Sequence, residues 1–371
     1  PYKDLFVKDF SIIERDPEVS IVVETIGGVG AALDYTTRAL KAGKSVVTAN
    51  KELVATHGYE LLQLAKEHGV SYLFEASVGG GIPILRPLNA CLAANEVDQV
   101  TGILNGTTNY ILTRMIKAGL TFDQALKEAQ ANGYAEQDPT ADIEGHDACR
   151  KICILASLAF GRHIYPRQVP TEGITGVTLA DVAYADSCGY KIKLLGRAIR
   201  EPEGKVCAFV APHLVSCENP LAGVEDVFNA ISVTGNAVGD VMFYGRGAGK
   251  LPTASAVVAD VVDALKNGVK VHDSLFWQPA DPVEGMLTDP APAAYYVRVE
   301  GIAPAVAEAI YGKGHVVEEH FDGCSYFVDS ADGKALAEAA RKVEAMGGSV
   351  KLVLRRLPED CLLYTSPSPR D

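Results

Sequence analysis

The chain has 371 residues, of which 48% are hydrophobic and 22% are charged. This length predicts two or three domains with sizeable cores, and the composition excludes general disorder, which requires low hydrophobicity together with high charge. The formal net charge of −13 argues against nucleic acid as the main partner, because so acidic a surface repels phosphate backbones.

Three further features of the composition bear on location. No apolar run approaches the ~20 residues that a membrane-spanning helix needs, so we expect no membrane partner. The eight cysteines are scattered without a C-x-x-C spacing, which is typical of reduced thiols in a cytoplasmic protein. The chain begins at Pro1 without an initiator Met, and we interpret this start as a truncation and the Pro/Ser-rich end, 361–371, as a non-native tail.

The first 82 residues alternate between two periodicities. We expect β-strands over 20–26, 45–48 and 71–76, and helices over 31–42 and 51–67. Strands that alternate with helices in this way indicate βαβ units and a parallel sheet, so 1–82 is predicted to be a partial Rossmann-type dinucleotide-binding domain, completed by 245–270.

The middle of the chain, 83–244, is predicted to be an α+β domain. Residues 83–161 have a mostly helical pattern, with a capping box at Thr121–Gln124 and a second helix over 145–160. Short alternating strands follow within 188–245, and Pro252 opens a helix that extends to about Lys266.

The C-terminal part begins with a Pro-rich linker over 271–293, which holds the single tryptophan, Trp277. Beyond the linker, strands and helices follow in the order βαββαβ. This order predicts a small ferredoxin-like module over 294–358.

Glycine-rich stretches leave several interpretations open. Gly28 and Gly30 follow a strand, but Leu33 stands where the third glycine of G-x-G-x-x-G belongs, so a strand-to-helix turn is favoured. The glycines of 245–249 precede a helix and suit either an anionic ligand or a plain tight turn. The glycines of 79–81 suit either a flexible loop or close contact with a ligand or cation.

An acidic stretch precedes the helix over 145–160. Glu136, Asp142 and Asp147 together would suit an ammonium-bearing substrate, and Asp147 lies one helical turn before Lys151. A lysine balanced between desolvation and a neighbouring carboxylate can donate a proton near neutral pH. A solvated acidic loop with an ordinary salt bridge is the alternative. Lys51 follows a parallel strand, where it could neutralise a carboxylate or phosphate, or could simply be solvated.

Four segments together resemble the homoserine dehydrogenase family: Val46–Lys51, Glu75–Pro83, Gly102–Tyr110 and Gly133–Lys151. The resemblance implies reversible NAD- or NADP-dependent reduction of L-aspartate 4-semialdehyde to L-homoserine, in threonine and methionine biosynthesis. It also implies that 83–244 is the substrate and catalytic domain and that a homodimer forms through it. The module over 294–358 is similar to the ACT domain, which implies a possible amino-acid effector.

The resemblance also implies roles for individual residues. Lys151 is the expected acid/base, and Lys51 is expected near both the nicotinamide and the substrate. The other implied contacts are Glu136, Asp142 and Asp147 with substrate, Gly133 and Gly249 with the cofactor, and Glu75, Val78, Gly80 and Ile82 with a sodium ion through backbone carbonyls.

Two departures from the family pattern matter. The family's first strand and its G-x-G-x-x-G turn are absent and are expected upstream of Pro1, so the choice between NAD and NADP is unreadable and the chain as given is expected to bind dinucleotide poorly. The module over 294–358 lacks the usual Pro-Gly after its first strand, which argues against feedback there. A non-catalytic amino-acid-sensing or interaction protein and a different semialdehyde or amino-acid dehydrogenase are the alternatives.

Overall fold

The computed structural model describes residues 5–267, 275–280, 289–320 and 322–358. The predicted tail, 361–371, lies outside these ranges, as does most of the predicted linker, 271–293. Contacts divide the chain into two compact units. Unit 1 comprises Pro1–Leu179, Leu194–Ala211 and Val224–Pro290, and unit 2 comprises Ala180–Lys193, Pro212–Gly223 and Ala291–Asp371. Within the described ranges, no helix is long and apolar enough to cross a membrane.

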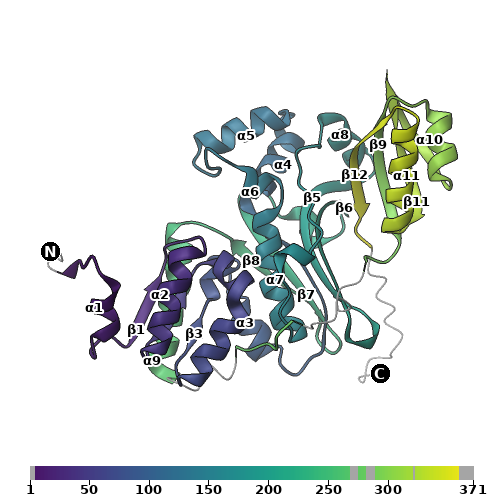
Figure 1. The fold of residues 1–371 in the computed structure, drawn as a ribbon. Helices are drawn as coiled ribbons and strands as arrows, with labels where there is room; N and C mark the ends of the chain where they lie inside the picture. Colours follow the sequence, from purple (N-terminus) through teal and green to yellow (C-terminus); the bar gives the residue numbers. More distant parts are fainter. Residues whose placement is uncertain (1–4, 268–274, 281–288, 321, 359–371) are drawn as a thin grey trace, which may run out of the picture. The chain divides into compact units, whose positions relative to one another are not determined.

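Unit 1 begins with a short helix, α1 (Phe10–Arg15), which the sequence analysis did not predict, followed by the predicted βαβ units. Its parallel sheet has the order β1-β2-β3 and consists of β1 (Ile21–Glu24), β2 (Ser45–Thr48) and β3 (Tyr72–Leu73). The helices α2 (Gly30–Lys41) and α3 (Lys51–Glu67) connect these strands and lie beside the sheet (Figure 1). The third strand is shorter than predicted because the chain turns into a 3₁₀ segment at Glu75–Ser77.

The helix predicted after Pro252 covers one face of this sheet. This helix is α9 (Lys250–Asn267), and it begins two residues before Pro252. Val47 and Leu73 of the sheet share a buried cluster with Ala264 of α9, and Val257 and Val261 pack against that cluster. Residues nearly 200 positions downstream thus contribute to the core of the first sheet.

The rest of unit 1 is built on antiparallel strands. In the order β6-β5-β4-β7-β8, these are β6 (Val206–Ser216), β5 (Tyr190–Arg200), β4 (Val97–Ile103), β7 (Phe228–Gly235) and β8 (Gly239–Arg246). Of β5 and β6, only the residues within 194–211 belong to unit 1. The sequence analysis treated 83–161 as mostly helical and omitted β4. It also expected short strands, whereas β5 and β6 each have 11 residues.

Four further helices of unit 1 are α4 (Gly106–Ala118), α5 (Phe122–Ala131), α6 (Thr140–Ile143) and α7 (His146–Phe160), of which α6 carries Asp142 and α7 carries Asp147 and Lys151. The predicted capping box at the start of α5 is present, with Thr121 and Gln124 bonded to each other's backbone. Helix α7 is largely buried. A Cβ at Gly196 of β5 would lie 3.2 Å from Ile152 Cβ, so the missing side chain lets α7 approach the sheet closely.

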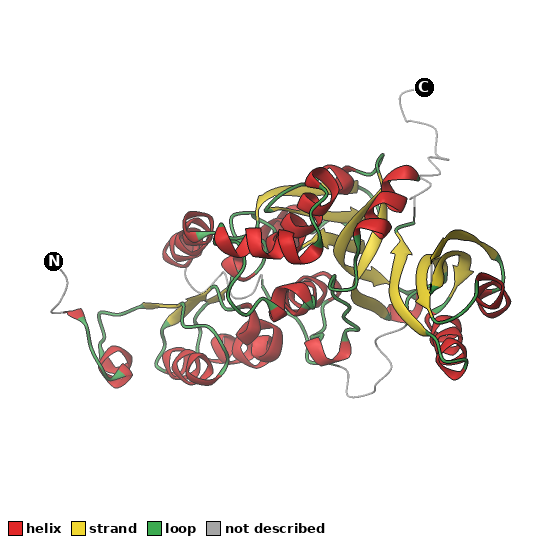
Figure 2. Ribbon diagram, turned by 90° about the horizontal axis from the view of Figure 1, so that it is seen from above, coloured by secondary structure: helices red, strands yellow, loops and turns green. Residues whose placement is uncertain are grey.

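Unit 2 contains the predicted βαββαβ order. Its elements are β9 (Ala293–Glu300), α10 (Pro304–Tyr311), β10 (Gly314–His320), β11 (Gly323–Ala331), α11 (Gly333–Ala345) and β12 (Ser349–Arg356). The strands lie in the order β10-β11-β9-β12 with antiparallel neighbours, and both helices lie on one side of them (Figure 2). Val297, Tyr326 and Val343 are at the centre of this unit's core. The helix α8 (Leu179–Ser187) stacks Tyr184 on Tyr296.

Candidate active site

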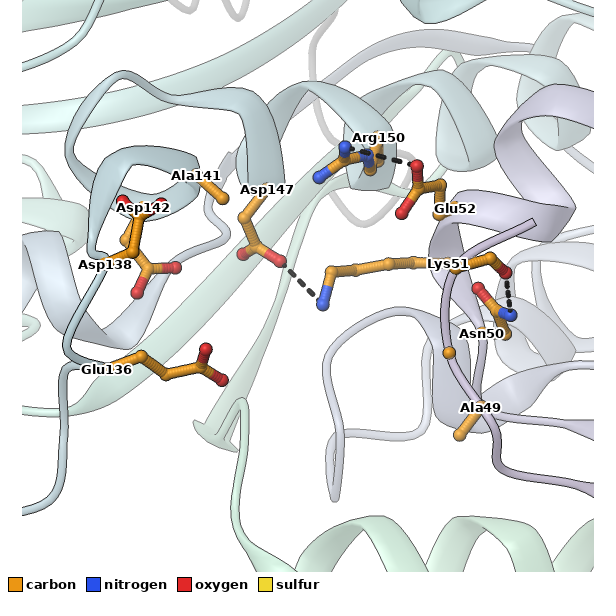
Figure 3. A pocket seen from close by; sticks show the side chains of 12 residues that line it. Ala49, Asn50, Lys51, Glu52, Glu136, Asp138, Ala141, Asp142, Asp147 and Arg150 are labelled. Carbon is orange, nitrogen blue, oxygen red and sulfur yellow. Dashed lines mark hydrogen bonds and ion pairs between the residues drawn. The ribbon is translucent and has the colours of Figure 1, made fainter. Parts of the chain in front are cut away.

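A pocket of about 250 Å³ lies in unit 1 at the carboxyl ends of β1 and β2. One side of it is lined by 27–28 and 49–52, which follow the two strands. The opposite side carries charged residues from the loop after α5 and from α6 and α7: Glu136, Asp138, Asp142, Asp147 and Arg150 (Figure 3). The carboxyl edge of a parallel sheet is where ligands of such folds bind.

A hydrogen-bonded junction holds the two strand ends together. The carboxylate of Glu24, which is buried, accepts hydrogen bonds from Thr48 Oγ1 at 2.5 Å and from the backbone N–H of Ile26 at 2.6 Å. Asn50 Nδ2 donates to the carbonyl of Gly28 at 2.6 Å. None of these junction side chains is predicted as a site residue from the sequence, although polar residues at two adjacent strand ends are a signal that could identify them.

Asn50 also determines where Lys51 points. Its side-chain oxygen accepts a hydrogen bond from the N–H of Leu53 and so caps α3, which makes Lys51 the first residue of that helix. From there the lysine side chain extends across the pocket, and its Nζ lies 3.0 Å from Asp147 Oδ1 (Figure 3).

Asp147 is shared between two lysines. Its Oδ2 lies 2.6 Å from Nζ of Lys151, so the ion pair predicted from their spacing is present. Lys151 is 7% exposed and also donates a hydrogen bond to the carbonyl of Leu104 at 2.8 Å. Burial tends to raise the pKa of Asp147, but the charges of Lys151 and Lys51 outweigh it and hold that pKa well below its usual range. Asp147 is therefore ionised at neutral pH.

Asp142 lies beside Asp147, and one amide connects them. Asn105 Nδ2 donates to Asp142 Oδ1 at 2.7 Å and to Asp147 Oδ2 at 2.9 Å. Burial and then the charge of Asp147 raise the pKa of Asp142, against the opposing hydrogen bonds from Asn105 and Thr107. Neither Asn105 nor the carbonyl of Leu104 is predicted as part of the site from the sequence, because both contact the acidic stretch from about 40 residues upstream.

The remaining predicted residues are more widely spread. Glu136 is exposed at the pocket wall, and its carbonyl accepts a hydrogen bond from Gln130 Nε2 at 3.1 Å. Gly133 forms the turn after α5 with φ +73°, and Gly249 immediately precedes α9 with φ +124°. Of these three, only Glu136 lines the pocket.

The residues at the strand ends fit the nicotinamide end of a dinucleotide. Gly27 and Gly28 have φ of +82° and +66°, and no heavy atom lies within 4 Å of a Cβ built at either position. A flat ring could therefore approach this backbone closely, with the ammonium of Lys51 beside it.

The loop over 75–82, which is expected to hold sodium, would offer a hard cation its backbone carbonyl oxygens. The Glu75 carboxylate accepts hydrogen bonds from the N–H groups of Ile84, Leu85 and Arg86 at 2.7–2.9 Å, so its oxygens are already engaged. A Cβ at Gly80 (φ +54°) would lie 2.5 Å from the carbonyl oxygen of Gly247. In the part of the chain that the structure describes, no group of three or more His, Cys, Asp or Glu side chains could hold a metal ion. Backbone carbonyl oxygens are a donor type that a hard cation accepts.

Comparisons with known proteins agree with one another. The family model described as homoserine dehydrogenase matches residues 83–262, and the model described as its NAD binding domain matches residues 3–75. The homoserine dehydrogenase of Synechocystis sp. is 48% identical over 71% of this chain and 61% of its own length, so the chain spans less than two thirds of that relative. The Pseudomonas aeruginosa homoserine dehydrogenase is 44% identical over 84% of this chain and 74% of its own length. The crystal structure of a homoserine dehydrogenase from Thiobacillus denitrificans aligns with a TM-score of 0.83 and 39% identity, covering 95% of this chain and 85% of that one.

Proposed function

Because the chain belongs to the homoserine dehydrogenase family, we propose that it catalyses the reversible NAD- or NADP-dependent reduction of L-aspartate 4-semialdehyde to L-homoserine. The observation that carries this proposal is the convergence of Lys51, Lys151 and Asp147 at the carboxyl edge of the dinucleotide-type sheet. The reaction belongs to threonine and methionine biosynthesis. The seven described cysteines are free, which supports a reducing compartment and hence the cytoplasm.

The pocket supplies different partners for the two ends of the substrate. In this proposal Glu136 and Asp142 bind its ammonium group together with Asp147, which is supported by the fact that all three line the pocket. Lys151 has three N–H donors, two of which are used by Asp147 and the Leu104 carbonyl; among the described residues the third is left for the aldehyde oxygen. Held in this way, the carbonyl carbon reacts as part of one positioned complex.

A bound dinucleotide would supply the hydride that adds to the aldehyde carbon. As that bond forms, the carbonyl π electrons move to the oxygen, where Lys51 and Lys151 stabilise the developing negative charge. Lys151 then transfers a proton to this oxygen, which completes the alcohol. In the reverse direction the neutral amine of Lys151 removes the hydroxyl proton. Gly133 and Gly249 are proposed to contact the cofactor, which rests on the resemblance alone.

The test is turnover of L-aspartate 4-semialdehyde with each reduced dinucleotide. Lys151→Ala should lower kcat by ~10²–10⁴, the range for loss of a general acid–base group. Lys342→Ala is a matched control, because Lys342 also forms an i,i+4 ion pair, with Glu338, but lies exposed in unit 2. An unchanged kcat in Lys151→Ala would remove this residue from the mechanism. A wild-type protein that neither turns over the aldehyde nor binds homoserine would favour the non-catalytic alternative.

A sodium ion at the carbonyls of Glu75, Val78, Gly80 and Ile82 is a second part of the proposal. It is supported by the left-handed glycines of this loop and by the engagement of the Glu75 carboxylate elsewhere. Sodium should raise the melting temperature relative to an equal concentration of a bulky organic cation. Equal melting temperatures would argue against the site.

Assembly and regulation complete the proposal. A homodimer through the middle domain is supported by large apolar side chains exposed on and beside β8, namely Val238, Met242 and Tyr244. Sedimentation should give twice the chain mass, and Tyr244→Arg should reduce it to the monomer mass. An amino-acid effector at the ACT-like module is supported by its βαββαβ order, and calorimetry with threonine tests it.

A further inference from the structure

Asn105 occupies a position that the proposed mechanism does not use. It follows β4, is 5% exposed, and caps α4 by accepting a hydrogen bond from the N–H of Thr108 at 2.8 Å. That bond directs its oxygen toward α4 and its NH₂ group toward α6 and α7. The two amide hydrogens then reach one oxygen of Asp142 and one of Asp147.

Two neighbouring carboxylates in a buried site disfavour each other's ionisation. Asp147 has Lys51 and Lys151 as counter-ions, whereas no ion pair connects Asp142 to a cation among the described residues. The amide of Asn105 is therefore the group that hydrogen-bonds to both acids at once, while the charge of Lys151 also lowers the pKa of both. The charged groups that surround the pair are Lys51 and Glu52 of α3, Glu136 and Asp138 of the loop after α5, and Arg150 and Lys151 of α7.

We propose that Asn105 is a positioning residue, whose amide holds Asp142 and Asp147 together, facing the pocket, so that both can receive the ammonium group of an amino-acid substrate. The substrate part of this inference rests on the proposed function. The positioning part does not, because it concerns the ligand-free protein.

Two variants separate positioning from helix capping. Asn105→Asp retains the size and the capping oxygen but replaces the donor with a third carboxylate. Asn105→Ser retains a capping hydroxyl but cannot reach both acids. Asp332→Ala is the control for loss of a cap alone, because Asp332 caps α11 in unit 2 through a 2.7 Å bond from the N–H of Ala335.

The first measurement is the carboxyl ¹³C NMR titration of Asp142 in the ligand-free chain. Its midpoint should rise by about one to two pH units in both Asn105 variants, because each loses a hydrogen bond to a charged acceptor. The Asp332→Ala control should leave the midpoint unchanged. An unchanged midpoint in Asn105→Asp, which keeps the cap and fills the same space, would overturn the proposal even if Asn105→Ser fails to fold.

The second measurement is calorimetric binding of L-homoserine across the same pH range. At pH 7 the Asn105 variants should bind about tenfold to a hundredfold more weakly than wild type, and this loss should grow as the pH falls through the raised midpoint of Asp142. A uniform loss at every pH would indicate a structural role only and would contradict positioning. A wild-type chain that binds no homoserine contradicts the proposed function instead, while the NMR midpoint still decides the role of Asn105.

Discussion

Gly58→Ala in the middle of α3 should change the free energy of unfolding through two opposing effects, helix propensity and steric overlap. Helix propensity alone predicts that alanine stabilises the helix by about 1 kcal/mol. The structure predicts the opposite sign, because a Cβ at this position would lie 2.6 Å from Cζ2 of Trp277. The helix is also distorted here, since His57 has non-helical φ and ψ of −129° and 16°.

The indole of Trp277 has little freedom to move away. It is 1% exposed, its Nε1 donates to Nδ1 of His163 at 3.0 Å, and its ring meets that of Phe74 edge-on at 5.6 Å. Overpacking of a tight core costs about 1–3 kcal/mol. Because the contact is so short and the partner is fixed, we place the cost in the upper part of that range. The net result should be a loss of about 1–2 kcal/mol once the propensity gain of about 1 kcal/mol is subtracted.

Urea unfolding followed by circular dichroism measures this difference, and the single tryptophan reports on the same place by fluorescence. In a Trp277→Leu background the obstacle is absent, so Gly58→Ala should change sign and stabilise the protein by up to about 1 kcal/mol. The same Gly58→Ala effect in both backgrounds, or a stabilised single variant, would refute the reasoning.

Two further predictions concern buried polar groups, one in each unit. His163 accepts a hydrogen bond at Nδ1 from Trp277, and its Nε2 lies 3.0 Å from the carbonyl of Ala55, so these contacts require the neutral ring. Burial lowers the pKa of His163. The unfolding free energy should therefore fall as the pH drops below about 6.5, because only the unfolded chain gains the proton there. Equilibrium unfolding between pH 7.5 and 5.5 measures this slope, which should be smaller in His163→Gln; an equal slope would contradict the assignment. In unit 2 the hydroxyl of Tyr296 donates to the fully buried Asp181 at 2.6 Å, so Tyr296→Phe should cost about 1.5–3 kcal/mol, and a thermal scan that matches wild type would contradict it.

Local patterns in the sequence were sufficient to predict most individual elements. The β-branched runs that form β1 and β2, the capping box of α5 and the βαββαβ order of unit 2 were all predicted and are present. Each of these elements is marked by residues that are close to one another in the sequence. The family resemblance, carried by four short segments, is confirmed by the matching family models.

The omitted strand β4 shows where local reasoning fails. Its sequence, 97–103, is part of a stretch with helical neighbours on both sides, and its hydrogen-bond partners are β5 and β7, about 100 and 130 residues downstream. Pairing over such separations leaves no mark on the local periodicity. The shortening of β3 has a similar cause, because Glu75 is recruited to the N–H groups of 84–86 and to Asp260 of α9.

The sequence was sufficient to predict which residue types form the candidate site, but not which ion pairs and hydrogen bonds join them. Charge and spacing made Glu136, Asp142, Asp147 and Lys151 candidates. The position after a parallel strand made Lys51 another, and the roles that the resemblance implies for all five stay predictions. The sequence does not reveal that one carboxylate serves both lysines, or that Asn105 bridges the two acids. These contacts depend on the β4–α4 junction meeting the start of α7, which is a property of the packed unit.

The charge balance of the pocket gives a physical reason to expect an ammonium-bearing ligand. When Lys151 is counted with the pocket lining, three cations face five carboxylates. Arg150 lies 3.6 Å from Glu52, and the two lysines are both engaged by Asp147, so Glu136, Asp138 and Asp142 have no ion pair with any described cation. A ligand with a positive charge at one end would relieve their mutual repulsion, whereas a purely anionic ligand would increase it. In the proposed mechanism, Lys51 and Lys151, both paired with Asp147, would meet the opposite end of the ligand, where negative charge develops only during the reaction.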